Sequence, residues 1–223
     1  MLSEPTNLGF VEHCEMALEQ QWGYVRGTFG QILTDGLLEY KLTQYSSNIL
    51  PYYNFIKKEY IGKRTTDCSG LIKSYLWWNN GDVDYDAFTD FSANDFYVKA
   101  EERGFIDSIP HIPGICVWKN NHVGVYIGEG SVIEAKGTMH GVVRTPLKGA
   151  GATKWTNWFK CHLIKYINPP KNYEEIIKEC TSSFDDWLIG IKDLVDMANA
   201  GKNIGSLKIF RYLPELIQKI YNR

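Results

Sequence analysis

The sequence predicts an α+β fold in which N-terminal helices pack on an antiparallel sheet of about five strands. Apolar residues recur at helical spacing through the first half of the chain. Between residues 114 and 166 they mostly alternate with polar residues, which is the period of a half-buried strand. Gly128-Glu129-Gly130 separates two of these strands and indicates a hairpin. Helices followed by antiparallel strands are typical of the α+β class.

Four helical segments are expected before the sheet. They are a helix over Asn7–Gln21, an inserted helical element within residues 29–63, and helices over Cys68–Trp78 and Asp95–Arg103. Residues 82–90 are expected to form a loop. The capping residues are Asp67 before the third helix, Ser92 before the fourth and Gly104 after it.

Five strands follow these helices. They are predicted at Gly114–Trp118, His122–Gly128, Ser131–Lys136, Gly141–Pro146 and Trp158–Tyr166. Asn168-Pro169-Pro170 then breaks the chain, and residues 171–223 predict a C-terminal helical hairpin. This extension either packs on the core or on itself, or it serves in docking or oligomerisation. The sequence does not decide between these, and it leaves the oligomeric state open.

The sequence Asp67-Cys68-Ser69-Gly70 indicates a nucleophile. A thiol attacks only as a thiolate, and a free cysteine with a pKa of ~8.5 is mostly protonated at neutral pH. Cys68 is expected in the first turn of its helix, where unpaired N–H groups and the helix dipole favour negative charge. We therefore expect the helix start to promote ionisation of Cys68.

A base and an orienting carboxylate follow on the next two strands. His122 begins one strand of the predicted hairpin, and Glu134 lies on the returning strand. Antiparallel pairing would bring Glu134 to the imidazole, where it could accept one ring N–H and fix the tautomer. His140 is a rival third residue, but its Gly137-Thr138-Met139-His140-Gly141 turn favours exposure.

These motifs resemble those of the NlpC-type cell-wall cysteine peptidases, the NlpC and p-sixty superfamily of papain-like enzymes. The matching segments are Asp67-Cys68-Ser69-Gly70, His122-Val123-Gly124-Val125-Tyr126-Ile127-Gly128 and Tyr24-Val25-Arg26-Gly27. The resemblance implies a papain-like peptidase domain over residues 1–168, with a Cys68, His122 and Glu134 triad. It also implies substrate-binding roles for Tyr24, Asp67 and Ser69, with Asp67 holding the free amino end of a stem peptide.

Three departures from the family pattern stand out. Residues 29–63 replace a short loop and are expected to wall the cleft. Gly114-Ile115 replaces the usual Gly-Asp before the histidine strand. Glu134 is acidic where a neutral or basic residue is more common, and an acid there favours imidazolium at His122.

Structural roles remain open for several of these residues. Asp67 could act only as a helix cap and Tyr24 only as a core aromatic. Trp155, Trp158 and Phe159 could line a glycan-contacting groove or belong to the core. The other four cysteines are expected in buried positions: Cys14, Cys116, Cys161 and Cys180.

Composition narrows the choice of partners and location. A net charge of −2 gives no basic stripe and argues against nucleic acid. Five cysteines without paired spacing favour a reduced chain. The N-terminus lacks the pattern of a signal peptide and no membrane span is expected, which predicts a cytoplasmic chain until release or phage delivery to the wall. No cofactor is expected, and His122, His140 and His162 have no metal-ligand spacing.

The sequence-based hypothesis is therefore a peptidoglycan endopeptidase that cleaves the bond between D-isoglutamate and the following diamino acid, with a phage lysin as one form. The alternatives are an N-acetylmuramoyl-L-alanine amidase or an acyltransferase of the same superfamily, or a non-catalytic wall-binding module.

Overall fold

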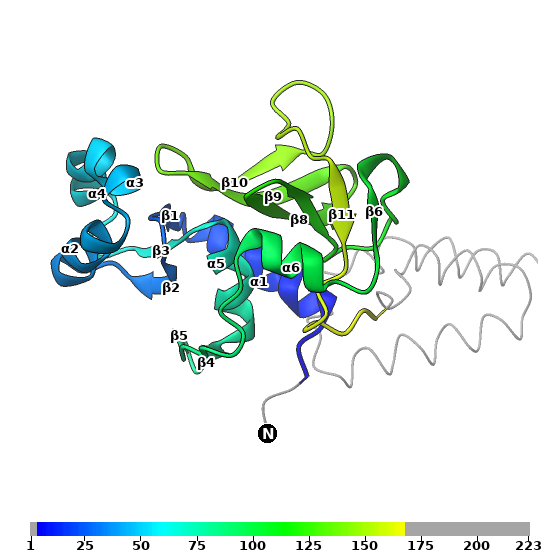
Figure 1. Ribbon diagram of the computed structural model, residues 1–223, viewed down its shortest axis with the longest axis horizontal. Coiled ribbons are helices and arrows are strands. Elements are labelled where there is room, and N and C mark those ends of the chain that lie inside the picture. Colours follow the sequence, from blue (N-terminus) through cyan, green and yellow to red (C-terminus); the bar gives the residue numbers. More distant parts are fainter. Residues whose placement is uncertain (1–3, 168–223) are drawn as a thin grey trace, which may run out of the picture. The chain divides into compact units, whose positions relative to one another are not determined.

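The computed structural model describes residues 4–167, which form helices packed against an antiparallel sheet (Figure 1). The predicted α+β class is confirmed for this range. The predicted C-terminal hairpin at 171–223, including Cys180, lies outside the described residues. Within the described range, no helix is both long enough and apolar enough to cross a bilayer.

The main sheet has six strands in the order β10-β9-β8-β7-β11-β6, and all its neighbouring strands are antiparallel. Positive φ angles at Gly128, Glu129 and Gly130 close the β8–β9 hairpin, a conformation that glycine adopts without strain. The strands are β6 (Arg103–Phe105), β7 (Cys116–Lys119), β8 (His122–Gly128), β9 (Ser131–Gly137), β10 (Gly141–Pro146) and β11 (Asn157–Phe159).

The prediction of about five strands did not include β6, and several predicted boundaries differ from those observed, two of them with a clear physical reason. Gly104 does not end the preceding helix but lies in β6, opposite Trp158 of β11. An added Cβ at Gly104 would stand 2.8 Å from the Trp158 indole nitrogen, so this pairing requires glycine. The last strand ends at Phe159 rather than Tyr166, because Cys161 to Ile164 form a turn closed by a backbone hydrogen bond.

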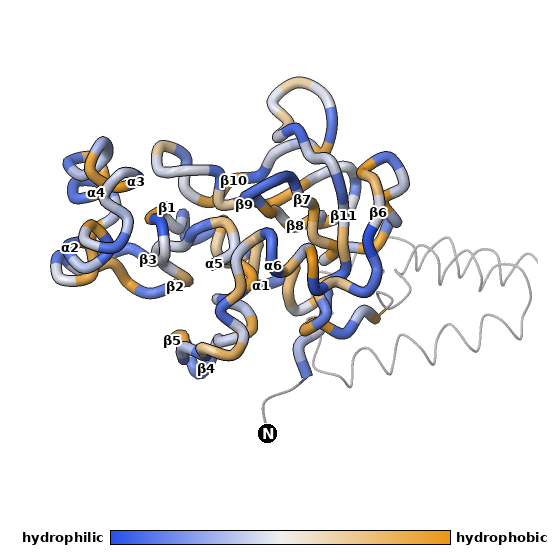
Figure 2. Tube along the Cα trace, viewed as in Figure 1, coloured by the Kyte–Doolittle hydropathy of each residue, from blue (hydrophilic) through white to orange (hydrophobic). Residues whose placement is uncertain are grey.

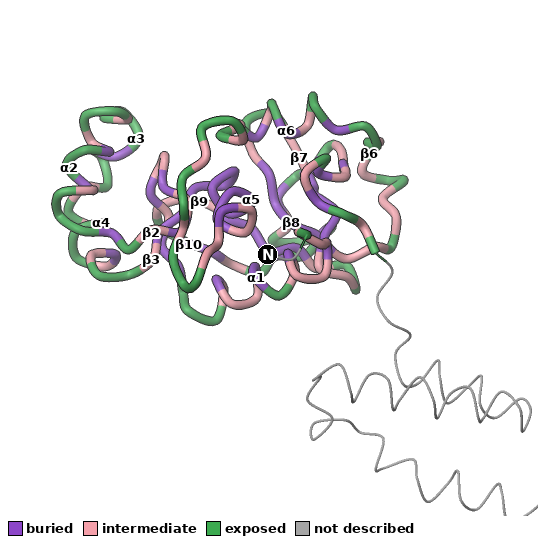
Figure 3. The backbone as a smooth tube through the Cα atoms, turned by 90° about the horizontal axis from the view of Figure 1, so that it is seen from below, coloured by how far each residue is buried: buried purple, intermediate pink, exposed green. Residues whose placement is uncertain are grey.

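Three helices cover one face of this sheet: α1 (Asn7–Glu19), α5 (Cys68–Leu76) and α6 (Ala93–Lys99). Each begins at a side-chain cap, from Thr6, Asp67 and Ser92 respectively. Helix α5 is buried from Cys68 to Ser74, as the uninterrupted buried stretch in Figure 3 shows. The helices and the sheet share one core that includes Phe10, Leu71, Ile72, Val123, Val125 and Ile133.

The other face of the sheet is covered by loops rather than helices. Tyr126 and Val132 from β8 and β9 pack there with Leu147 and Trp155. Strands β8 and β9 are each buried at four successive positions, 123–126 and 132–135, and Figure 2 shows apolar segments within the sheet. The sheet therefore has two apolar faces, and a side chain on either face can be held rigidly.

A second, smaller core lies beneath the inserted segment. A three-stranded sheet in the order β1-β3-β2 connects it to the start of α5. The elements are β1 (Gly23–Tyr24), β2 (Phe29–Ile32), α2 (Asp35–Gln44), α3 (Ser46–Ile49), a 3-10 turn (Leu50–Tyr52), α4 (Tyr53–Glu59) and β3 (Arg64–Thr66). The buried apolar residues of this second core are Val25, Leu33, Leu38, Ile49, Ile56 and Tyr60. The insertion thus brings its own apolar core.

A short hairpin follows α5, formed by β4 (Trp78–Asn79) and β5 (Asp82–Val83). The predicted loop at residues 82–90 therefore begins within a strand. Cys14, Cys116 and Cys161 are fully or almost fully buried and unpaired, as expected of core cysteines.

His13 is a buried imidazole behind α5. Its Nε2 lies 2.8 Å from the Ser74 hydroxyl, and its ring packs against Trp22, Tyr75 and Trp78. Burial and the nearby Arg64 guanidinium lower the pKa of His13 from 6.5 to about 4. The folded protein therefore holds this imidazole neutral at pH values where the unfolded chain protonates it.

We expect this shift to make the fold acid-sensitive. Between pH 6.5 and pH 4 only the unfolded chain gains the His13 proton, so the free energy of unfolding should fall by about 3 kcal/mol over that window. Urea unfolding of wild type and His13→Gln at several pH values measures the difference. The variant should show a flatter pH dependence. His140→Gln, at an exposed turn, should keep the wild-type slope, and equal slopes in all three proteins would refute the assignment.

Candidate active site

Cys68 lies at the first position of α5, directly after β3. Asp67 caps the helix: its Oδ1 accepts hydrogen bonds from the Gly70 N–H at 2.7 Å and the Ser69 hydroxyl at 3.1 Å. Its Oδ2 accepts the Gly27 N–H at 2.9 Å, which connects the β1–β2 turn to the helix start. A Cβ at Gly70 would stand 2.1 Å from the Thr28 carbonyl oxygen, so this tight junction requires glycine.

The imidazole and the carboxylate form the contact expected of a hairpin. His122 Nε2 lies 2.7 Å from Glu134 Oε2 across β8 and β9. The Thr145 and Thr153 hydroxyls donate to the other carboxylate oxygen, at 2.7 and 2.6 Å. Glu134 is fully buried, and these three partners account for both of its oxygens.

These contacts decide the charge of Glu134. Burial opposes its ionisation, but the hydrogen bonds from His122, Thr153 and Thr145 together outweigh burial and hold the pKa of the carboxyl below its usual value. An ionised carboxylate can only accept, so Nε2 must carry the proton that it shares with Glu134. The Nδ1 atom of His122 is then the ring nitrogen that can act as a base.

Trp155 fixes the plane of the imidazole. The two rings stack with centroids 5.2 Å apart and planes 6° apart. Trp155 is itself buried, and its ring packs against Gly124, where a Cβ would stand 3.0 Å from the indole. This explains why Trp155 belongs to the core and yet touches a candidate catalytic residue.

At the start of β8, Cys68 approaches the backbone of the two residues that flank His122. The thiol packs with the helix-face core, whereas the imidazole lies on the face that Trp155 covers. The Cys68 thiol donates to the Asn121 carbonyl at 3.8 Å. A backbone hydrogen bond from Val123 to the sulfur lowers the pKa of the thiol. The sulfur thus touches the residues on both sides of His122. In this structure its hydrogen bond is to the backbone carbonyl and not to the ring.

The backbone at the helix start lowers the pKa of Cys68, in the expected direction, but other effects outweigh it. Burial and the adjacent Asp67 raise the pKa of the Cys68 thiol to about 11, despite opposing contributions from Arg26 and from the Val123 and Ser69 backbone. The thiol is 3% exposed, and loss of hydration explains the sign of the shift. Cys68 therefore needs a base to remove its proton at neutral pH.

Tyr24 and Arg26 border the thiol from the β1 side. Burial, followed by the proximity of Cys68 and Asp67, raises the pKa of Tyr24 well above its usual value, so Tyr24 is a neutral hydroxyl. Burial lowers the pKa of Arg26, but the nearby Asp67, Tyr24 and Cys68 outweigh burial and raise it. The guanidinium therefore lies among the same groups. Tyr24 also packs against the main core, so both roles considered for it apply.

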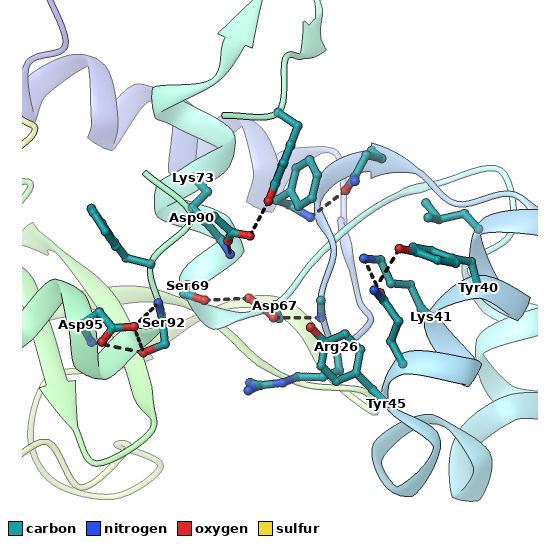
Figure 4. A pocket seen from close by; sticks show the side chains of 17 residues that line it. Arg26, Tyr40, Lys41, Tyr45, Asp67, Ser69, Lys73, Asp90, Ser92 and Asp95 are labelled. Atoms are coloured by element: carbon teal, nitrogen blue, oxygen red, sulfur yellow. Dashed lines mark hydrogen bonds and ion pairs between the residues drawn. The ribbon is translucent and has the colours of Figure 1, made fainter. Parts of the chain in front are cut away.

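A pocket of about 580 Å³ opens beside the two neighbours of Cys68 (Figure 4). The inserted helix α2 forms one wall, α5 another, and the segment before α6 a third. Its charged lining residues are Arg26, Lys41, Asp67, Lys73, Asp90 and Asp95. The inserted segment thus walls a cavity next to the residues on either side of Cys68.

The remaining candidates lie elsewhere. His140 is exposed in the β9–β10 turn, and Glu134 occupies the third position.

In residues 4–167, no three histidine, cysteine or acidic side chains cluster in a way that could hold a metal ion. Gly114, in the altered Gly-Ile pair, donates its N–H to the Tyr126 carbonyl at 2.7 Å and adopts a positive φ.

Sequence reasoning missed Thr145, Thr153, Arg26 and Lys41 as site residues. The alternation of β10 places Thr145 on one face, but only the β9–β10 register sets it beside Glu134. Thr153 lies in a loop, and Lys41 lies in a helix for which the motifs give no position. For Thr153 and Lys41 the sequence holds no local signal.

Comparison with known proteins gives structural likenesses at low identity. No protein-family model matches the chain, and no curated protein matches its sequence. Three solved structures resemble it, each over 72% of this chain. The peptidoglycan hydrolase RipB of Mycobacterium tuberculosis is 17% identical with a TM-score of 0.36, and 67% of it is covered.

The other two are a p-sixty domain and a protozoan protein. The p-sixty domain of an M. avium subspecies paratuberculosis antigen is 18% identical, with a TM-score of 0.36 and 98% coverage. NlpC1 of Trichomonas vaginalis is 15% identical, with a TM-score of 0.39 and 47% coverage. These neighbours carry the family names that the motifs suggest. Because every TM-score is below 0.5, the functional proposal is based on the residues of the site.

We expect the two threonines to control the pH range over which the His122–Glu134 pair can act as a base. In the Thr145→Val/Thr153→Val double variant, loss of two hydrogen bonds raises the pKa of Glu134, so the carboxylate is lost at a higher pH as the solution is acidified. The acid limb of Cys68 alkylation by iodoacetamide should move upward by about one pH unit.

Thr156→Val is the matched control, because the Thr156 hydroxyl donates to the Trp118 carbonyl and not to Glu134. This control should keep the wild-type profile. An unchanged acid limb in the double variant would show that the threonines do not act through Glu134.

Proposed function

We propose that this chain is a cysteine peptidase that cleaves bacterial cell-wall stem peptides between D-isoglutamate and the following diamino acid. One observation carries the chemistry: a buried, ionised Glu134 fixes the imidazole of His122 beside the strand start that Cys68 touches. The substrate class comes from the resemblance of the Tyr24, Asp67-Cys68-Ser69-Gly70 and His122 motifs to the cell-wall peptidases.

The proposed reaction begins with proton transfer. The Cys68 thiol leaves the Asn121 carbonyl and gives its proton to Nδ1 of His122, while Glu134 stabilises the resulting imidazolium through Nε2. Because burial raises the pKa of Cys68, this transfer is the step that makes the nucleophile.

Acyl transfer then follows in two halves. The thiolate attacks the γ-carbonyl of D-isoglutamate, and the Cys68 N–H at the first position of α5 stabilises the oxyanion. His122 returns its proton to the leaving amine of the diamino acid, which leaves a thioester on Cys68. His122 then removes a proton from water, which attacks the thioester, and the thiol is restored as the carboxylic acid is released.

Substrate positioning is proposed for the groups around Asp67. Its carboxylate already caps α5. The Ser69 hydroxyl donates to this carboxylate, and Tyr24 lies close enough for Asp67 to raise its pKa. A carboxylate can accept about four hydrogen bonds, and three are in place here, so a substrate ammonium can still be accommodated. Cap and substrate-binding residue are therefore compatible roles.

The pocket argues against the acyltransferase alternative. An acyl chain needs an apolar channel, whereas six charged side chains line this cavity. The complete set of Cys68, His122 and Glu134 likewise disfavours a non-catalytic wall-binding module. The amidase alternative uses the same chemistry on a different bond, so product analysis must separate it. Delivery to the wall, by phage release or otherwise, remains a prediction.

We expect digestion of purified peptidoglycan to produce new amino termini on the diamino acid, detected by mass spectrometry. Cys68→Ala should lower the rate by a factor on the order of a thousand or more, because no other group can form the thioester. Cys161→Ala removes another buried thiol and should retain activity.

Two outcomes would contradict the proposal. A free amino terminus on L-alanine, released from the lactyl group of muramic acid, would identify an amidase. Equal activity of wild type and Cys68→Ala would remove Cys68 from the mechanism.

A further inference from the structure

Lys41 is a buried cation on the inserted helix α2. The residue is 8% exposed and lines the pocket next to Asp67 and Ser69. Its ammonium donates to the Gln44 side-chain oxygen at 3.0 Å and lies 5.2 Å from the centroid of the Tyr40 ring. Among residues 4–167, no carboxylate lies within ion-pair distance of it.

The carboxylates that line the pocket are already engaged. Asp90 pairs with Lys73 at 2.7 Å and accepts the Tyr85 hydroxyl. Asp95 accepts both the backbone N–H and the hydroxyl of Ser92 at the start of α6.

Asp67 accepts hydrogen bonds from the start of α5 and from Gly27, and it forms no ion pair with Lys41 or Arg26; its remaining acceptor position is the one proposed for the substrate ammonium. Lys41 and Arg26 are therefore the two cations of this pocket that form no ion pair within the described part of the chain, and Figure 4 shows both bordering it.

An ammonium on a residue that is 8% exposed, with one neutral acceptor and no direct ion pair, is only partly compensated for its lost solvation. The pKa of Lys41 is accordingly lowered, by burial first and by Lys73 as the repelling cation, while Asp67 and Asp90 oppose the shift. An anion in the pocket would restore this lost solvation with charge-assisted hydrogen bonds from Lys41. Arg26 offers a planar donor fork to the same ligand.

We infer that this pocket binds a free carboxylate of the peptide substrate, through Lys41 and Arg26, immediately beside the bond that Cys68 attacks. The inference rests on the proposed function and adds a specificity to it. The γ-linked D-isoglutamate residue contributes the scissile carbonyl and carries its own α-carboxylate. The pocket wall includes both sequence neighbours of Cys68, so that carboxylate is the acidic group nearest the reaction. The enzyme therefore selects peptides with D-isoglutamate over those with the amidated residue, D-isoglutamine.

Two synthetic tripeptides test this selection: L-Ala-γ-D-Glu-diamino acid and the same peptide with an α-carboxamide. The amide closely matches the acid in shape but is neutral and presents an NH2 donor in place of one acceptor oxygen. With the full chain, kcat/KM should favour the acid on the order of tenfold or more, the loss expected when a charged hydrogen bond is removed. Lys41→Met should lower kcat/KM for the acid by a similar factor and leave the amide unchanged.

Two further variants control for folding and charge. Lys41→Arg keeps the cation and should keep the preference for the acid. Lys58→Met removes a lysine charge from the same insertion at an exposed site, with 82% of its side chain accessible, and should change neither substrate. Thermal unfolding of each variant identifies any that fails to fold, in which case Lys41→Gln replaces Lys41→Met.

Binding of both peptides to Cys68→Ala, measured by calorimetry, separates this inference from the proposed reaction. Cleavage without preference for the acid, or an equal loss for both peptides in Lys41→Met, overturns the carboxylate site and leaves the peptidase. Lys41-dependent binding of the acid without cleavage by wild type overturns the reaction and leaves the site. Absence of any Lys41-dependent preference in both measurements overturns the inference.

Discussion

The buried carboxylate of Asp67 is the constraint on which the rest of the site depends. It caps α5 through Gly70 and holds the β1–β2 turn through Gly27, so it places Cys68 beside Tyr24 and Arg26. The same negative charge, added to burial, raises the pKa of Cys68 to about 11. The group that fixes the position of the nucleophile thus opposes its ionisation. A strong and well-oriented base becomes necessary for any reaction at neutral pH.

Glu134 answers that need at the other side of the site. It is as buried as Asp67, but its neighbours are hydrogen-bond donors whose combined effect holds its pKa low. An ionised Glu134 keeps the proton on Nε2 of His122, which leaves Nδ1 as the ring nitrogen that can accept a proton in the proposed reaction. Trp155 holds the ring plane while this happens. The two buried carboxylates therefore have opposite consequences for the ionisation of Cys68. Asp67 raises the pKa of the thiol, whereas Glu134 orients the base that removes its proton in the proposed reaction.

Sequence patterns predicted those parts of the site that local rules determine. The cap at Asp67 follows from residue type and position, and the approach of His122 to Glu134 follows from hairpin pairing across a glycine turn. The pKa of Cys68 could not be predicted, because burial is set by the packing of α5 on the sheet. Thr153 and Trp155 come from a loop whose path only the folded chain defines. Strand β6 was missed for the same reason, since its three residues form a strand only by pairing with β11.

The division of the chain into two apolar cores explains how specificity could change without disturbing the chemistry. The catalytic candidates depend on the sheet and on α5, which share the main core. Helix α2 packs on a separate core with Leu33, Leu38 and Ile56, and it reaches the site only through the wall of the pocket. A substitution on α2 can therefore alter what the pocket accepts while α5 and the His122–Glu134 hairpin keep their positions. An insertion whose helices pack on their own core is thus suited to carry substrate selection, because Cys68 belongs to the other core.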